Sequence, residues 1–215
     1  MGTIEARVYD IPMDQLKNAE DFTLEALQMD KERVVERYAD SYGDTLARCF
    51  KELKCQGLCN SFAITAKDGN QIELEGGVIL KSKVLAEMLD GADEVVAYAV
   101  TVNGHDELMD DPDNSILENM FYNAWGVGFS MSAHRWFKKM IKEQVRECGR
   151  YAGRGWIPGE EGVEISLQNE LFGLIDPSQI GITLTGTSMH PVMSVNGFMG
   201  ISDDPAIEDV GRGVA

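Results

Sequence analysis

The segment "IGITLTGTSMHPVMSVNGFMGI" at Ile180–Ile201 constrains the fold most directly. Its two ends are apolar and β-prone, whereas residues 185–191 between them combine Thr, Gly, Ser, Met, His and Pro. Apolar runs bounded by turn-forming residues of this kind are typical of strands. We therefore expect two strands here, joined by a polar, sulfur-containing turn that strand pairing alone does not require.

Upstream of this segment, hydrophobic spacing predicts helices that alternate with a hairpin. A helix is expected from Lys31, capped by Asp30, with one buried face. Period-two alternation on either side of Asp68-Gly69 predicts a β-hairpin, because glycine accepts the positive φ of a tight turn. The side chains expected on the buried face of the helix are Val34, Val35, Tyr38, Tyr42, Leu46, Cys49, Phe50 and Leu53.

The rest of the chain adds elements of both kinds. The longest helical pattern is rich in Gly, Ala and Ser at its middle, which predicts the close approach of another backbone. The expected elements are a short helix capped by Ser82 and ending near Gly91, a buried strand over residues 94–102, a helix over residues 115–149, an irregular Gly-rich loop over residues 150–162, a helix over residues 164–176 and a frayed tail over residues 202–215.

This mixture predicts an α+β fold. We expect a single mixed domain over residues 31–215, with a long central helix and antiparallel strands, preceded by an N-terminal helical extension over residues 1–30. A chain of 215 residues can bury a hydrophobic core of useful size without disulfide bonds.

The charge of the chain is strongly acidic. Nineteen Lys and Arg residues against 36 Asp and Glu residues give a formal net charge of −17. Such a field argues against nucleic-acid and anionic-membrane partners, because both are recognised by clustered cations. It leaves open an acidic face that docks a basic partner. Because no secretory signal or membrane-spanning run is visible, we expect a cytoplasmic protein.

The cysteines and histidines allow two interpretations. Cys49, Cys55 and Cys59 lie close in sequence, but their spacing is not that of a standard zinc or iron–sulfur site. Cys55 and Cys59 could share one helix face, as buried thiols or as a redox or metal pair. His105 and His134 are expected to be structural or surface groups. No metal site is predicted. A metal or redox protein built on the cysteines nevertheless remains one of the functional hypotheses, beside the two given below.

The Gly-rich segment after residue 149 carries two arginines beside two aromatic residues. The guanidinium groups of Arg150 and Arg154 could grip a carboxylate through paired hydrogen bonds, and the flexible glycines could bring backbone amides to the same ligand. Tyr151 and Trp156 could cover a flat or cationic group. The alternative is a surface loop whose arginines only form ion pairs with carboxylates of the acidic surface.

The order of these segments resembles the activation domain of cobalamin-dependent methionine synthase, and resembles more closely its free-standing relatives associated with corrinoid methyltransferases in anaerobic microbes. The matching residues are Arg150-Tyr151, the helix ending in "LFGLID", "IGITLT" at Ile180–Thr185 and "PVMSVNG" at Pro191–Gly197. Upstream, "VVAYAVTVNGHDEL" and "NAWGVGFSMSA" are similar to the family's strand-and-Gly turn and its central helix.

The resemblance implies a domain that binds S-adenosylmethionine and faces cobalamin or another corrinoid, carried by a partner corrinoid protein or cobalamin-dependent methyltransferase. It implies a role in the reductive remethylation, or reactivation, of that cofactor. Carried over, Arg150 would hold the donor's carboxylate, and the backbone of Ala152 and the following glycines would hold the rest. The implied binding residues are Arg150, Tyr151, Ala152, Gly153, Arg154, Gly155 and Trp156 on one wall, and Thr185, Thr187, Ser188, Met189 and His190 on the other.

Two departures from the family pattern keep a second hypothesis open. Gly153-Arg154-Gly155-Trp156 replaces Pro-Gly-Tyr, and Leu184-Thr185-Gly186-Thr187 replaces Leu-Thr-Glu-Ser, which removes a carboxylate. The alternative is a non-catalytic corrinoid-binding or docking module that has lost the S-adenosylmethionine site, with His190 as a candidate contact to the corrinoid. The sequence identifies no catalytic residue and leaves open whether the chain forms a homo-oligomer.

Overall fold

Strand β5 (Glu94–Asn103) lies near the centre of the structure, a computed structural model that describes residues 2–211. It is hydrogen-bonded along its length to β2 (Lys54–Asp68) and to β9 (Ser194–Ser202), and all pairings are antiparallel. The sheet has seven strands in the order β4-β3-β2-β5-β9-β6, with β1 also paired to β2. The other strands are β1 (Arg7–Ile11), β3 (Gln71–Leu74), β4 (Ile79–Lys81) and β6 (Tyr151–Trp156).

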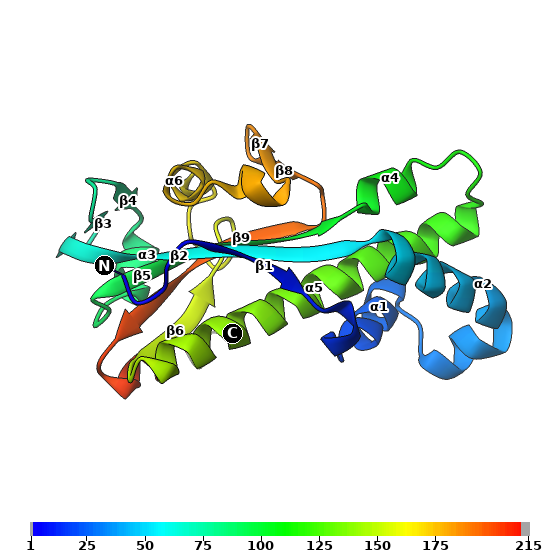
Figure 1. Ribbon diagram of the computed structural model, residues 1–215, viewed down its shortest axis with the longest axis horizontal. Helices are drawn as coiled ribbons and strands as arrows, with labels where there is room; N and C mark the ends of the chain where they lie inside the picture. The colour runs from blue at the N-terminus through cyan, green and yellow to red at the C-terminus, as the bar shows by residue number, and fades with distance from the viewer. Residues whose placement is uncertain (1, 212–215) are drawn as a thin grey trace.

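The sheet separates two hydrophobic cores (Figure 1). The long helix α5 (Ile116–Glu147) runs along one face and packs with α1 (Ala19–Leu27) and α2 (Lys31–Glu52). On the other face lie α6 (Leu167–Leu174) and the small hairpin of β7 (Thr183–Thr185) and β8 (Ser188–His190). The remaining elements are α3 (Lys83–Met88), α4 (His105–Met109) and the short 3₁₀ helices η1 (Met13–Gln15), η2 (Pro177–Ile180) and η3 (Pro205–Asp209).

The helix starts are set by local capping. Asp30 accepts a hydrogen bond from the Arg33 amide at the start of α2, and Ser82 accepts one from the Leu85 amide at the start of α3. Ser115 and Glu118 form a reciprocal capping box at the start of α5. These bonds satisfy amides that have no partner within the helix. The predicted starts of all three helices are confirmed.

Helix α5 approaches its neighbours at glycines. A Cβ at Gly128 would lie 2.5 Å from the carbonyl oxygen of Ala19 in α1, and one at Gly126 would lie 2.2 Å from the His105 ring. On the sheet, a Cβ at Gly57 would lie 2.5 Å from the ring of Phe137, which α5 places over β2. The predicted close backbone approach at the middle of this helix is confirmed.

Several predicted elements differ from the structure. Residues 150–162, expected as an irregular loop, contain β6, because Tyr151 and Ala152 pair with Ser202 and Ile201 of β9. The expected N-terminal helical extension contains α1, but it also contains β1, which pairs with β2 and lies on the main core. Cys55 and Cys59 lie on strand β2 rather than on a helix.

Two members of the predicted buried face and the tail also need correction. Val35 is 52% exposed and Phe50 is 50% exposed, whereas Val34, Tyr42 and Cys49 of the same helix are buried. The tail is not frayed over residues 202–211, since η3 forms there and buries Ile207. Residues 212–215 lie outside the described part of the chain, as does residue 1.

The predicted fold class is confirmed, because the structure is a mixed α+β domain with a long central helix against an antiparallel sheet. The hairpin predicted at Asp68-Gly69 is also present, with Asp68 paired to Gln71. Among residues 2–211, no helix combines the length and the apolar character that a membrane crossing requires.

Replacing Gly128 with alanine should lower the free energy of unfolding by roughly 1–3 kcal/mol, because the new methyl group meets backbone that cannot turn aside. Chemical denaturation measures this change. Gly43→Ala is the matched control: Gly43 is an exposed position in α2 with nothing within 4 Å of an added Cβ. The control should be neutral or stabilise by up to about 1 kcal/mol. Equal effects in the two variants would contradict the packing argument.

Candidate functional site

The residues of the first predicted wall, Arg150–Trp156, lie at the edge of the sheet. Strand β6 pairs on one side with β9, and the register shifts between Ala152 and Gly155. Residues 153 and 154 together therefore oppose the single residue Gly200, so one of them is extra to the regular ladder. Main-chain groups in such an interruption are suited to contact a ligand.

Arg150 at the start of β6 is enclosed by acidic groups. Its side chain forms ion pairs with Asp93, Glu94 and Asp203, the last at 2.7 Å from Nε. It also donates to the Thr3 hydroxyl at 3.0 Å. The Arg150 side chain is only 16% exposed. Its partly buried ion pairs and hydrogen bond therefore connect the N-terminal segment, the start of β5 and the chain after β9. One cation among three carboxylates leaves a net negative charge.

Glu94 has the most buried carboxylate of this cluster. Burial alone would raise its pKa, but hydrogen bonds from the Thr3 amide, the Thr3 hydroxyl and the Ser61 hydroxyl, together with the charge of Arg150, outweigh burial and lower the pKa of Glu94. The carboxylate is thus held in its charged form.

Arg154 has a different environment. Its guanidinium stacks over the Trp156 ring at 4.9 Å and pairs with one carboxylate, that of Glu161. Trp156 is only 3% exposed and packs in the core that also contains α6. The Trp156 ring, which was expected to cover a ligand, is therefore buried against other side chains of the protein. Arg154 is the more exposed of the two stacked side chains.

The chain after β9 crosses β6. A Cβ at Gly153 would lie 3.0 Å from the Ile207 carbonyl oxygen. Further along the crossing segment, Gly211 contacts Arg154 and Trp156. The crossing segment is fixed by a two-point pairing of Arg146 with Glu208. Helix η3 thus lies against the strand that carries the predicted site.

A buried polar pair lies beneath the glycines of β6 and β9. Tyr98 extends across both strands, so that its hydroxyl would be 2.7 Å from a Cβ at Gly155 and 2.5 Å from one at Gly197. The Tyr98 hydroxyl hydrogen-bonds His134 Nε2 at 2.9 Å. Burial, with the nearby charge of Lys138, lowers the pKa of His134 to about 3, so its imidazole is neutral near pH 7.

Lys138 is the residue that sequence reasoning missed. Its side chain is half-buried against Gly155 and forms no ion pair or hydrogen bond with the described residues 2–211. Burial lowers its pKa, and the charges of Arg154, Lys142 and Arg135 lower it further, whereas the negative charge of Glu160 opposes them. The only available sequence signal was its place one helical turn after His134.

The residues of the second predicted wall form the exposed hairpin. Thr185, Thr187, Ser188 and His190 are exposed, whereas Met189 is half-buried and its sulfur accepts a hydrogen bond from the Asn196 amide at 3.2 Å. The segment leading into the hairpin is held by Asn103, whose side-chain amide donates to the Ile180 carbonyl at 3.1 Å.

The structure does not bring Arg150 and the hairpin into one cleft. Arg150 bonds to Glu94 at the first residue of β5, whereas the hairpin is anchored at Asn103, the last residue of β5. Nine extended residues separate these positions, which corresponds to about 30 Å, and the second anchor of the hairpin, Asn196 opposite Ala99, is about 16 Å along the strand from Glu94. The predicted pair of facing walls is therefore wrong for Arg150, and each segment must be considered by itself.

The cysteines are placed as packing groups. Cys49, Cys55 and Cys59 are buried in the core beneath α5, and burial raises the pKa of each thiol to about 12. Cys148 is exposed at the end of α5. Among residues 2–211, no group of three His, Cys, Asp or Glu side chains is arranged to hold a metal ion.

Comparison with solved structures identifies the architecture. The chain is similar to the crystal structure of the MetH reactivation domain bound to AdoHcy, with a TM-score of 0.70 and 16% sequence identity. The similarity covers 92% of this chain and 78% of that one. No protein-family model matches the sequence, and no curated protein matches it. The fold expected from the sequence resemblance is thus confirmed.

Glu94→Gln should lower the free energy of unfolding at pH 7 by about 1–3 kcal/mol, because it removes a charged acceptor of several hydrogen bonds. The folded-state pKa of Glu94 is lowered, so its stabilisation is present above the unfolded value of about 4.3 and is lost as pH falls. Urea denaturation between about pH 7 and pH 3 should therefore show the variant converging on the wild type.

Glu75→Gln is the control for this series, since Glu75 is exposed in the turn after β3. It should change the free energy of unfolding by less than about 0.5 kcal/mol at any pH. If Glu94→Gln lowers the free energy of unfolding by the same amount down to low pH, the ionisation of Glu94 does not contribute to stability.

In the native protein, one of the four thiols should react rapidly with a disulfide reagent near pH 8. Cys148 is exposed, whereas burial keeps the other three thiols protonated and covered. Absorbance of the released thiolate counts reacted groups. Cys148→Ser should abolish the fast phase, and denaturation should restore the remaining three. Rapid reaction of Cys55 or Cys59 in the native state would favour the redox hypothesis instead.

Proposed function

We propose that this protein binds S-adenosylmethionine and assists the reductive remethylation of a corrinoid cofactor held by a partner protein. The observation that carries the proposal is the match of architecture, over 92% of the chain, to a reactivation domain whose crystal structure contains AdoHcy. The motifs around Arg150 and Ile180 support it from the sequence side. In the reaction the donor would supply the methyl group and leave as S-adenosylhomocysteine, and a separate one-electron reductant would supply the electron that reduces the corrinoid.

The geometry favours Arg154 and Lys138 over Arg150 for the donor's carboxylate. Arg150 already faces three carboxylates, which would repel a fourth. Arg154 faces one, and Lys138 makes no ion pair within the described chain. Both lie beside Gly155, and the carboxylate would relieve the mutual repulsion of the two cations that lowers the pKa of Lys138.

The remaining contacts to the donor are assigned to backbone. The register shift in β6 places one extra residue at Gly153-Arg154, and its unpaired backbone groups would suit hydrogen bonds to an adenine or ribose. Trp156 is buried and takes no part. The acidic groups around Arg150 suit the positive amine or sulfonium of the donor better than its carboxylate.

The exposed hairpin is proposed as the contact to the corrinoid partner. Its hydroxyls at Thr185, Thr187 and Ser188 and the imidazole of His190 are accessible on a short, two-stranded projection. A projection of this kind suits docking to a second protein more than enclosure of a small ligand.

A second candidate function is a docking module that no longer binds the donor. The specific observation in its favour is the saturation of Arg150 by Asp93, Glu94 and Asp203, at the position where the resemblance puts the carboxylate contact. In this alternative, Arg150 is a structural tie, and the hairpin alone is functional.

Isothermal titration with S-adenosylmethionine and with S-adenosylhomocysteine tests the proposal. Arg154→Gln and Lys138→Gln should each weaken binding by roughly tenfold, because each removes a charge-assisted contact. Lys51→Gln removes the same charge from an exposed position of α2 and is the control that should leave the affinity unchanged. Arg150→Gln should lower thermal stability more than affinity.

Two outcomes decide between the candidates. Absence of binding heat with either nucleoside, with and without a corrinoid protein, would eliminate donor binding and leave the docking module. A visible-spectrum titration with free cobalamin then tests the corrinoid contact, and His190→Ala should abolish any shift that arises from cobalt ligation. Loss of binding in Arg150→Gln with normal stability would return the carboxylate to Arg150.

A further inference from the structure

A cavity between α5 and the start of α1 differs in charge from the rest of this acidic protein. It has a volume of about 410 Å³ and is lined by Gln15, Lys17, Asn18, Ser132, Arg135, Trp136 and Lys139. Three of these side chains are cations, and no Asp or Glu is among these lining residues. In a chain with net charge −17, such a concentration of positive charge needs a physical reason.

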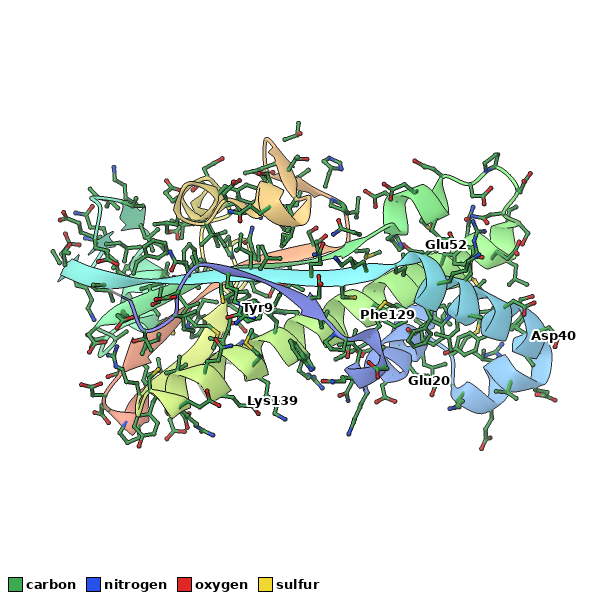
Figure 2. All side chains as sticks on the ribbon, in the orientation of Figure 1. Tyr9, Glu20, Asp40, Glu52, Phe129 and Lys139 are labelled. Carbon is green, nitrogen blue, oxygen red and sulfur yellow. The ribbon has the colours of Figure 1, made fainter. Side chains whose placement is uncertain are left out.

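One face of α5 builds most of the cavity. Ser132, Arg135, Trp136 and Lys139 follow the spacing that places residues on the same side of a helix. Figure 2 shows Lys139 projecting from α5 away from the sheet. Its side chain is 77% exposed and forms an ion pair with Glu143 at 3.6 Å on the surface of the helix. The guanidinium of Arg135 is held over the Phe22 ring at 4.8 Å, which positions it without neutralising it.

One buried hydroxyl and two more accessible polar side chains line the cavity without a partner in the described chain. Ser132 is only 4% exposed, yet its hydroxyl makes no hydrogen bond with any residue of the described chain. Lys17 is exposed and likewise makes no ion pair within residues 2–211. Asn18 stands at the N-cap of α1, but its side chain makes no capping bond. A hydroxyl, an amide and cations converging on one cavity are the groups that bind phosphate.

A flat wall completes the cavity. The indole of Trp136 is fixed by a hydrogen bond from its Nε1 to Gln15 Oε1 at 3.2 Å. It remains partly exposed, whereas Trp125 and Trp156 are buried. An indole held at the side of a cationic cavity can stack on a planar ring, and the volume suits a small ligand.

We propose that this cavity binds the phosphate of a small nucleotide-like monophosphate, with its phosphate on Lys17, Arg135, Lys139 and Ser132 and its ring on Trp136. The site is separate from the predicted S-adenosylmethionine residues on β6 and does not depend on them.

Titration with AMP, inorganic phosphate and adenosine tests the proposal on the full chain. AMP is expected to bind with a Kd on the order of 0.1–1 mM, inorganic phosphate more weakly, and adenosine most weakly. Binding is followed by calorimetry and by tryptophan fluorescence, which should report mainly on Trp136. Trp136→Phe should remove the fluorescence change while calorimetry still detects phosphate.

The decisive variant is Lys17→Gln/Lys139→Gln, which leaves the Arg135 contact to Phe22 intact and should weaken AMP binding at least tenfold. Ser132→Ala should weaken it several-fold. Arg33→Gln/Lys51→Gln removes the same charge from exposed positions of α2 and should change the affinity by less than about twofold. Each variant is checked for folding by circular dichroism.

Three results would overturn the proposal: no binding of AMP or phosphate at about 10 mM, equal weakening in the two double variants, or unchanged affinity in Lys17→Gln/Lys139→Gln. Tight binding of adenosine without phosphate dependence would also exclude it, because the cationic groups would then have no role. These outcomes do not bear on S-adenosylmethionine, whose binding should be unaffected by Lys17→Gln/Lys139→Gln.

Discussion

The packing of α5 depends on three positions without side chains. Gly128 admits the backbone of α1, Gly126 admits the ring of His105, and Gly57 on the sheet admits Phe137. Because interiors are close-packed, a methyl group at any of them would move the helix. The same helix carries His134 and Lys138 to the underside of β6 and presents Arg135 and Lys139 to the cationic cavity. Both proposed ligand sites therefore depend on the position of α5, which these three close contacts fix.

The features that the sequence predicted correctly are those whose signals lie within a few residues. The caps at Asp30 and Ser82 and the turn at Asp68-Gly69 are local, and all three are present. Strand β6 escaped prediction because its glycines have low strand propensity and its only partner, β9, lies more than forty residues later. The surroundings of Arg150 were equally hidden, since its acidic partners come from two distant parts of the chain.

Net charge is a poor guide to the local field in this protein. Most of its acidic groups face solvent. Several cations form ion pairs with particular carboxylates, as Arg48 does with Glu52 and Asp111. Lys17, by contrast, forms no ion pair with residues 2–211, and Lys138 has only the longer-range attraction of Glu160. Recognition of anionic ligands requires only that cations be locally unneutralised in a concave, partly desolvated place. An acidic protein can therefore contain two separate sites for anionic groups.

The crossing of β6 by η3 also determines where the sheet ends. An open strand edge presents unpaired amides and carbonyls to any other extended chain and invites edge-to-edge association between molecules. Here the register shift at Ala152–Gly155 and the carbonyl of Ile207 over Gly153 interrupt that edge. A ligand that uses the same backbone groups must share the space with this cover. The segment that keeps the sheet from growing thus also controls access to the backbone of β6.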